Sequence, residues 1–121
     1  MPQPERIFPM VLALVIGVLG VLPASAALVS ADLENGSQIF STNCAGCHMG
    51  GGNVIRASRT LSQSDLQAHL DSYSQDHLEA IEHQIELGKN AMPPYEGKLS
   101  EADIADVAAY VEEQAERGWQ R

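Results

Sequence analysis

Apolar residues recur at helical spacing in four stretches of the chain from Ala31 onward, and the connecting stretches are rich in Gly, Pro, Ser and Asn. We find no stretch whose pattern predicts a β-strand. The sequence therefore predicts an all-α domain. Its helices are expected from about Leu33 to Asn43, from Ser62 to a break at residues 71–74, from Asp76 to Gly88, and from Ser100 toward the C-terminus.

Three of these helices carry an N-terminal capping signal, in which a Ser or Asp is followed three positions later by Asp or Glu. The capping residues are Ser62, Asp76 and Ser100, and Gly88 is suited to end the third helix. Gly36 allows a second element to approach the first helix closely. The residues expected to be buried are Leu33, Gly36, Ile39, Phe40, Leu66, Leu70, Leu78, Ile81, Ile85, Ile104, Val107, Ala108 and Val111. The expected solvated face of the last helix comprises Asp106, Glu112, Glu113 and Glu116.

The N-terminal residues have the pattern of a cleaved export signal. Arg6 precedes an uncharged apolar run over residues 7–22, and Pro-Ala-Ser-Ala follows. Cleavage is expected after Ala26, or as late as residue 30. An uncleaved membrane anchor is the alternative, but a run of about sixteen residues is shorter than the roughly 20 that a spanning helix needs. The predicted organisation is a signal peptide at residues 1–26 and a single domain at residues 31–121.

The exported part, about 90 residues long, is sufficient for one domain but too small for a large apolar core, so a bound cofactor would contribute to its folding. The chain contains sixteen Asp and Glu against seven Lys and Arg. Loss of Glu5 and Arg6 with the signal peptide leaves fifteen against six, and the formal net charge stays at −9. This balance argues against nucleic acid as a partner. The negative charge serves either solubility alone or electrostatic steering of the protein toward a basic surface of a partner.

The pentapeptide Cys44-Ala45-Gly46-Cys47-His48 contains the chain's only two cysteines. The spacing is typical of covalent haem attachment, because two thiols one helical turn apart can bond to two porphyrin vinyl groups while the histidine binds the iron. A dithiol redox site would also use Cys-x-x-Cys, but it belongs at a strand-to-helix junction. A zinc site needs four ligands, and no second cysteine pair is present. We therefore predict one covalently bound haem c, followed by a glycine-rich loop at residues 49–53.

The haem iron has a second axial position, and the residue that fills it separates electron transfer from gas binding or catalysis. Met92 is the main candidate, because Pro93 and Pro94 stiffen the loop that presents its thioether. Met49 adjoins His48 and cannot reach the opposite face of the haem. Ligation by a second histidine is the alternative, and the candidates, all in predicted helices, are His69, His77 and His83.

Several segments form a recognisable combination: the haem motif, Gly51–Ile55, Thr60–Leu61, Gly88–Pro93 and the pattern from Leu99 to Trp119. Together they make residues 31–119 resemble cytochrome c6, a family of small soluble carriers of cyanobacteria and algae. The resemblance implies a class I cytochrome c fold with four helices wrapped around one covalent haem. It also implies thioether bonds from Cys44 and Cys47, axial ligation by His48 and Met92, and supporting roles for Asn53 at a propionate and Gln84 near the haem edge.

The resemblance further implies a mainly monomeric one-electron carrier rather than an enzyme. Its expected donor is the cytochrome b6f complex and its expected acceptor is photosystem I, with a respiratory terminal oxidase as a second acceptor. The expected location is the thylakoid lumen, with the periplasm as the alternative, and no stable membrane insertion is expected. The rival interpretation is a haem-based gas-binding or sensor module.

Three places depart from the family pattern. His83 stands where an aromatic residue commonly precedes the glutamine, Pro94-Tyr95 replaces Ala followed by Trp or Phe, and Lys98 stands where many members have arginine. Lysine keeps the charge of arginine but lacks its planar fork. These departures therefore concern docking to a partner rather than the haem chemistry.

Overall fold

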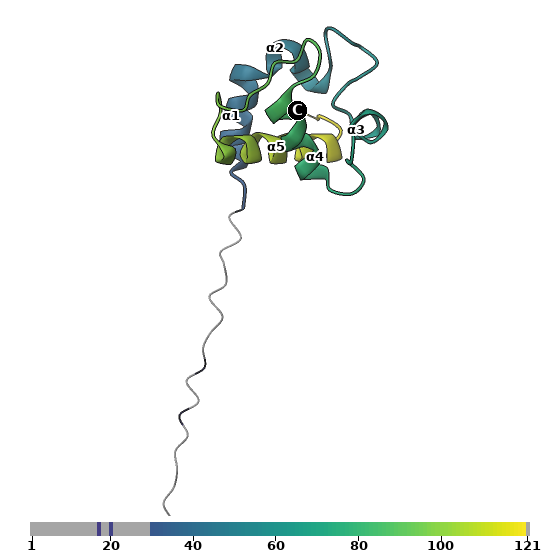
Figure 1. Cartoon of the computed structure of the whole chain (residues 1–121). Coiled ribbons are helices and arrows are strands. Elements are labelled where there is room, and N and C mark those ends of the chain that lie inside the picture. The colour runs from purple at the N-terminus through teal and green to yellow at the C-terminus, as the bar shows by residue number, and fades with distance from the viewer. Residues whose placement is uncertain (1–16, 18–19, 21–29, 121) are drawn as a thin grey trace, which may run out of the picture.

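The computed structural model describes residues 30–120 together with Gly17 and Gly20, and the elements are helical (Figure 1). They are α1 (Leu33–Asn43), α2 (Ala45–His48), the 3₁₀ turn η1 (Met49–Gly51), α3 (Gln63–His69), α4 (His77–Leu87) and α5 (Glu101–Glu116). The described part has no strand, only two isolated bridges, Lys89–Met92 and Glu96–Leu99. The all-α prediction is confirmed. The predicted signal peptide, residues 1–26, lies outside the described residues apart from the two glycines.

The four predicted helices correspond to α1, α3, α4 and α5, and the structure adds α2 and η1 after the first of them. The predicted loop at residues 49–53 therefore begins with a 3₁₀ turn. Within it Gly50 has a φ of +65° and Gly51 a φ of +80°. Only glycine adopts such angles without strain, so these residues turn the chain directly after His48.

Helices α1, α3, α4 and α5 each begin with a side-chain cap. Ser62, Asp76 and Ser100 accept hydrogen bonds from the backbone N–H groups three positions later, as the sequence predicts. Asp32 caps α1 in the same way, which the sequence pattern does not identify. At its other end α4 stops at Gly88, whose φ is +64°. These local signals set the helix boundaries without the help of tertiary contacts.

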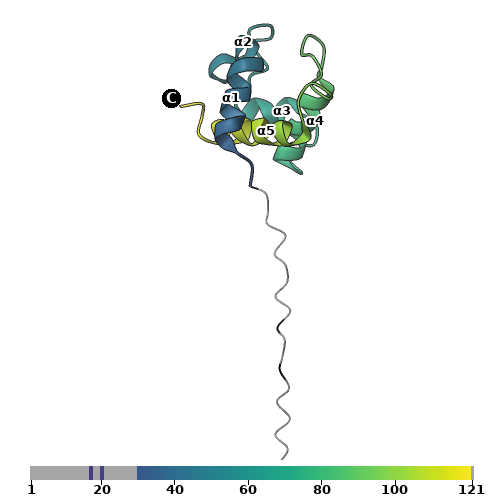
Figure 2. The same cartoon turned by 90° about the vertical axis from the view of Figure 1, so that its left-hand side faces the viewer.

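Helices α1 and α5 cross each other, as Figure 2 also shows. A β-carbon at Gly36 would overlap the backbone carbonyl of Asp106, so the two backbones touch directly. Polar contacts extend the crossing, because the Asn35 side chain donates to Asp103 and Asp106 at 3.0 and 2.9 Å. The Asp32 N–H donates to Asp106 at 2.8 Å. The predicted close approach at Gly36 is therefore confirmed, and its partner is α5.

The core contains most of the residues expected to be buried. Leu33 and Leu78 are exceptions, since 41% and 42% of their surfaces are exposed. Both lie in the first turn of a helix, within two residues of an exposed capping residue. None of the helices within residues 30–120 is long and apolar enough to cross a membrane. The buried apolar residues are Ile39, Phe40, Leu66, Tyr73, Ala80, Ile81, Ile85, Ile104, Val107, Ala108, Val111 and Ala115.

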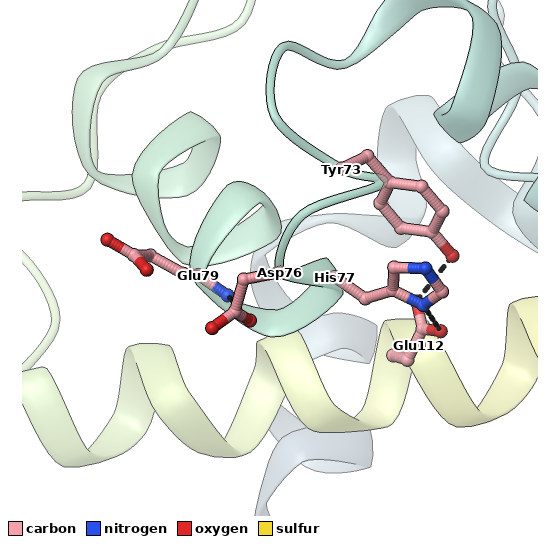
Figure 3. Close-up of polar contacts among 5 residues, drawn as sticks. All are labelled: Tyr73, Asp76, His77, Glu79 and Glu112. Carbon is pink, nitrogen blue, oxygen red and sulfur yellow. Dashed lines mark hydrogen bonds and ion pairs between the residues drawn. The ribbon is translucent and has the colours of Figure 1, made fainter.

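Glu112 contradicts the prediction that it lies on the solvated face of the last helix. It is only 7% exposed. The hydroxyl of Tyr73 and Nδ1 of His77 each donate a 2.7 Å hydrogen bond to one of its carboxylate oxygens. Figure 3 shows both side chains directed at Glu112 from the neighbouring segment. Because these two donors replace water, the carboxylate is stable inside the fold.

Candidate haem site

The end of α1 leads directly into the haem motif. The Cys44 N–H donates to the Phe40 carbonyl at 2.9 Å. The N–H groups of Cys47 and His48 then donate to the Cys44 carbonyl at 3.1 and 2.9 Å, which closes the pentapeptide into one tight turn. Both cysteines are free thiols, and together with His48 they line a single cleft.

The wall of this cleft is apolar and is built from every long helix. Val107 is 1% exposed and Ile81 is 4% exposed, so the wall belongs to the core. Such a surface suits a large, flat, apolar group. The apolar lining residues are Phe40, Leu61, Leu66, Leu70, Ile81, Ile85, Val107 and Val111.

The imidazole of His48 is held by the loop that follows it. Its Nδ1 lies 2.9 Å from the carbonyl oxygen of Gly52. A carbonyl can only accept a hydrogen bond, so Nδ1 carries the proton in this arrangement. The other ring nitrogen, Nε2, is thereby left as a lone-pair donor for a metal ion.

Met92 lines the same cleft from the segment that follows α4. Its N–H and carbonyl make hydrogen bonds of 2.9 and 3.0 Å with the carbonyl and N–H of Lys89. Asn90 between them has a φ of +53°, which completes a tight turn. The loop is thus fixed by hydrogen bonds as well as by the two prolines after Met92.

Gln84 and Asn53 both line the cleft, but their amides have different neighbours. Nε2 of Gln84 lies 3.9 Å from the sulfur of Met92, the distance of a weak hydrogen bond to a thioether. The Asn53 amide instead holds its own loop, donating to the Arg59 carbonyl at 2.9 Å and accepting from two backbone N–H groups, those of Ile55 and Arg56.

The chain is similar in sequence and structure to known proteins of one family. The family model for cytochrome c oxidase, cbb3-type, subunit III matches residues 31–111. The chain is 53% identical over 88 residues to the cytochrome c6 of Limnospira maxima, covering 73% of this chain and 99% of that protein. It is 48% identical over 115 residues to the cytochrome c6 of Thermosynechococcus vestitus, and this match covers 95% of this chain and 97% of that protein. The crystal structure of cytochrome c6 from the diatom Phaeodactylum tricornutum superposes on this structure with a TM-score of 0.68 at 46% sequence identity. The superposition covers 74% of this chain and 100% of the diatom protein.

The chain belongs to the cytochrome c6 family. Members of the cytochrome c6 family carry electrons from the cytochrome b6f complex to photosystem I. The chain is therefore an electron carrier of photosynthesis rather than an enzyme, and it carries one covalent haem c at Cys44 and Cys47. The predicted family, fold class, cofactor and general function are confirmed.

The residues of the cleft fit the haem that the family implies. Two free thiols, one imidazole with an unprotonated Nε2 and one thioether line the same cleft. Nitrogen and sulfur donors of this kind are the ligands that haem iron takes in electron carriers. The apolar wall would cover the rest of the porphyrin.

The other candidate histidines differ in whether they line the cleft. His69 is exposed and lines the cleft from the end of α3. His77 is bonded to Glu112 and does not line the cleft. His83 is exposed on α4 and is also outside the lining. Of the candidates for the second ligand, Met92 and His69 line the cleft, whereas His77 and His83 do not.

Arg56, Arg59 and Tyr95 line the cleft and were not among the predicted site residues. Arg56 and Arg59 lie in the loop that Asn53 holds, and Tyr95 follows the two prolines. The Tyr95 hydroxyl donates to the Asn43 carbonyl at 3.0 Å, which ties the Met92 loop to the end of α1. A basic pair close after the haem motif is the signal by which the arginines could have been found.

Burial and hydrogen bonding shift the pKa values of groups in the cleft, among them those of Cys44 and Asp65. Burial, and to a smaller extent the nearby Cys47, raise the pKa of the Cys44 thiol to about 11, so this thiol is protonated at neutral pH before haem attachment. Hydrogen bonds from the hydroxyl and the N–H of Thr60 lower the pKa of Asp65. Asp65 therefore remains a carboxylate beside the cleft in mildly acidic solution.

Proposed function

We propose that this protein carries single electrons from the cytochrome b6f complex to photosystem I, with His48 and Met92 as the axial ligands of its haem iron. The supporting observation is that one cleft brings together two thiols, the imidazole and the thioether from two distant segments of the chain. When a haem is bound, His48 and Met92 would hold its iron from both sides and leave no open position for a substrate, which favours electron transfer.

The chain's own residues then have distinct tasks. When bound, the haem supplies an iron centre that takes up and releases one electron. Cys44 and Cys47 anchor it, while His48 offers Nε2 and keeps its proton at Nδ1 through Gly52. The thioether of Met92 is a neutral ligand that favours the reduced state, and the apolar wall excludes water and acts in the same direction.

Two further residues support this arrangement. The Gln84 amide, 3.9 Å from the sulfur, competes for the sulfur lone pair and so favours the reduced state. Asn53 holds the loop at residues 53–59 beside the cleft and stands where the family contacts a haem propionate. We assign it to that propionate.

The edge through which electrons pass is partly apolar. Val54 and Ile55 follow Asn53 and are 72% and 62% exposed, and Met49 beside the proximal histidine is 69% exposed. Lys98 places its Nζ 5.8 Å from the ring of Tyr95, which itself lines the cleft. An apolar rim with charges around it suits a short-lived complex whose affinity decreases with salt.

We further propose that residues 1–26 direct the protein to the thylakoid lumen. The match to the Limnospira maxima protein supports removal of a segment, because it covers 99% of that protein with only 73% of this chain, and the lumen follows from membership of the family. A respiratory terminal oxidase is the alternative acceptor.

A redox titration of the haem-loaded domain tests the ligand assignment. The parent should show one reversible one-electron transition at a positive potential and the far-red band of methionine-bound ferric haem. Met92→Ala should lose that band, lower the potential and allow carbon monoxide to bind the reduced iron at neutral pH. Met49→Ala is the matched control, because Met49 is exposed beside His48 and should leave the spectrum unchanged. An unchanged spectrum in Met92→Ala would refute ligation by Met92.

Carbon monoxide binding also separates the rival function. A gas-binding or sensor module would bind carbon monoxide in the parent protein, without any substitution. The proposed carrier would not, because the Met92 thioether already holds the sixth position. The acceptor is tested by flash-induced oxidation of the reduced protein by isolated photosystem I, with decreasing rates at increasing salt.

A further inference from the structure

A path of hydrogen bonds connects the C-terminal Trp119 to the loop that holds His48. The indole Nε1–H of Trp119 donates to the carbonyl of Leu61 at 2.9 Å. The N–H of Leu61 then donates to the carbonyl of Gly51 at 2.7 Å. The next residue, Gly52, provides the carbonyl that accepts from His48 Nδ1.

Direct packing reinforces this path. The indole ring lies against Gly51 so closely that a β-carbon at that position would overlap three of its ring atoms. Gly51 is buried and has a φ of +80°, so both its conformation and its neighbour require glycine. The indole thus covers the turn that precedes the Gly52 carbonyl.

Trp119 is itself held firmly, although it lies beyond the end of α5. Its N–H donates to the Gln114 carbonyl at 2.8 Å. Its ring packs on Phe40 with centroids 5.3 Å apart and meets the ring of Tyr110 edge-on at 6.3 Å. Trp119 is not among the residues that line the haem cleft, so it acts on that cleft only through its neighbours.

We propose that Trp119 is a positioning residue for the proximal histidine. Its indole fixes the peptide between Gly51 and Gly52, so that the Gly52 carbonyl stays aligned with Nδ1–H of His48. This inference rests on the proposed function, because it takes His48 as an iron ligand.

A hydrogen bond at Nδ1 makes the imidazole a stronger electron donor to the metal. A stronger donor stabilises ferric iron relative to ferrous iron. Loosening of the Gly52 carbonyl should therefore raise the midpoint potential and expose the Nδ1 proton to solvent. A residue that only packs the core would change neither quantity.

The test compares Trp119→Phe with Ile104→Val in the haem-loaded domain. Trp119→Phe keeps an aromatic ring but removes the donor to Leu61 and part of the cover over Gly51. Ile104→Val removes buried atoms from α5, where Ile104 is 3% exposed and does not line the cleft, so it controls for lost stability. The measurements are the midpoint potential, the solvent exchange of the His48 Nδ1 proton in the reduced protein by nuclear magnetic resonance, and the urea midpoint.

We expect Trp119→Phe to raise the potential and to accelerate exchange of the Nδ1 proton roughly tenfold, the equivalent of one hydrogen bond. Ile104→Val should change only the urea midpoint. The proposal is overturned if Trp119→Phe behaves like Ile104→Val, with potential and exchange unaltered. If Trp119→Phe does not retain the fold, Trp119→Tyr is measured in the same way.

These outcomes are separate from those of the proposed function. The far-red band of the parent protein reports on Met92, whereas the exchange of the Nδ1 proton reports on the support of His48. A parent without the band would refute the ligand set while the comparison between Trp119→Phe and Ile104→Val could still be read. A parent with the band and an unaffected Trp119→Phe would refute only the role of Trp119.

Discussion

The hydroxyl of Tyr73 donates a 2.7 Å hydrogen bond to Oε2 of Glu112, which lies 39 residues further along the chain on α5. His77 donates to the other carboxylate oxygen, and its ring stacks on that of Tyr73 with centroids 4.0 Å apart. The segment between α3 and α4 is therefore attached to α5 by a buried carboxylate (Figure 3). Removal of either donor leaves that carboxylate with fewer partners.

Substitution of Tyr73 by Phe tests the strength of this attachment. Tyr73→Phe keeps the ring, which is 1% exposed, and removes one hydrogen bond to a charged group. We expect the free energy of unfolding to decrease by about 1.5–3 kcal/mol. Urea denaturation of the haem-loaded protein measures it. Tyr110→Phe is the control and should change it by less than about 0.5 kcal/mol; equal effects of the two substitutions would contradict the assignment.

The raised pKa of Tyr73 predicts how the free energy of unfolding changes at alkaline pH. Burial first, and then the hydrogen bond to Glu112, raise the pKa of Tyr73 from its ordinary value of 10.0 to about 12. In the unfolded chain the phenol loses its proton near pH 10, and in the folded chain only near pH 12, so between these values the unfolded state binds fewer protons. Stability is thus fully present below pH 10 and decreases toward pH 12. Urea midpoints over this range should vary less in Tyr73→Phe, and an identical slope would count against the raised pKa.

The helix crossing at Gly36 has no room for a side chain. A β-carbon there would overlap the Asp106 carbonyl, and backbone atoms cannot move aside as a side chain can. We expect Gly36→Ala to lower the free energy of unfolding by about 1–3 kcal/mol, although alanine favours the helix by about 1 kcal/mol. Gln38→Ala, at an exposed position of the same helix, should be nearly neutral. A stabilised Gly36→Ala variant would show that the backbones do not touch.

The proximity of Gln84 to Met92 predicts a change in redox potential. Gln84→Leu removes the amide that lies 3.9 Å from the sulfur while keeping a side chain of similar size. The thioether should then donate more strongly to ferric iron and lower the potential by roughly 40 mV, the one-electron equivalent of a hydrogen bond of ~1 kcal/mol. Potentiometric titration of parent and variant measures this shift. A potential that rises or stays constant would place the amide away from the sulfur in the loaded protein.

Much of the fold could be predicted because its signals are local. The caps at Ser62, Asp76 and Ser100 and the stop at Gly88 depend on residues within one turn. The haem motif is equally local, since five consecutive residues contain both thiols and the imidazole. Each of these predictions needed only the spacing of neighbouring residues.

The features that could not be predicted depend on partners far along the chain. Glu112 has a polar side chain beside a buried stripe, and only the donors Tyr73 and His77 explain why it is inside. Trp119 likewise acts through a distant neighbour, because its indole N–H donates to the carbonyl of Leu61. The periodicity of apolar residues describes one helix at a time, so it cannot show which residues of different elements will contact each other.

The contact between α1 and α5 joins the two ends of the domain, so everything from Cys44 to Ser100 is one loop closed by that contact. The entropy cost of closing a loop increases only with the logarithm of its length, and a doubling costs about 0.6 kcal/mol. A change of length inside this loop therefore costs the closing contact little, provided that the contacts of Tyr73 and His77 with Glu112 and the lining of the cleft are kept. Chains of different lengths can in this way keep the same frame around the haem.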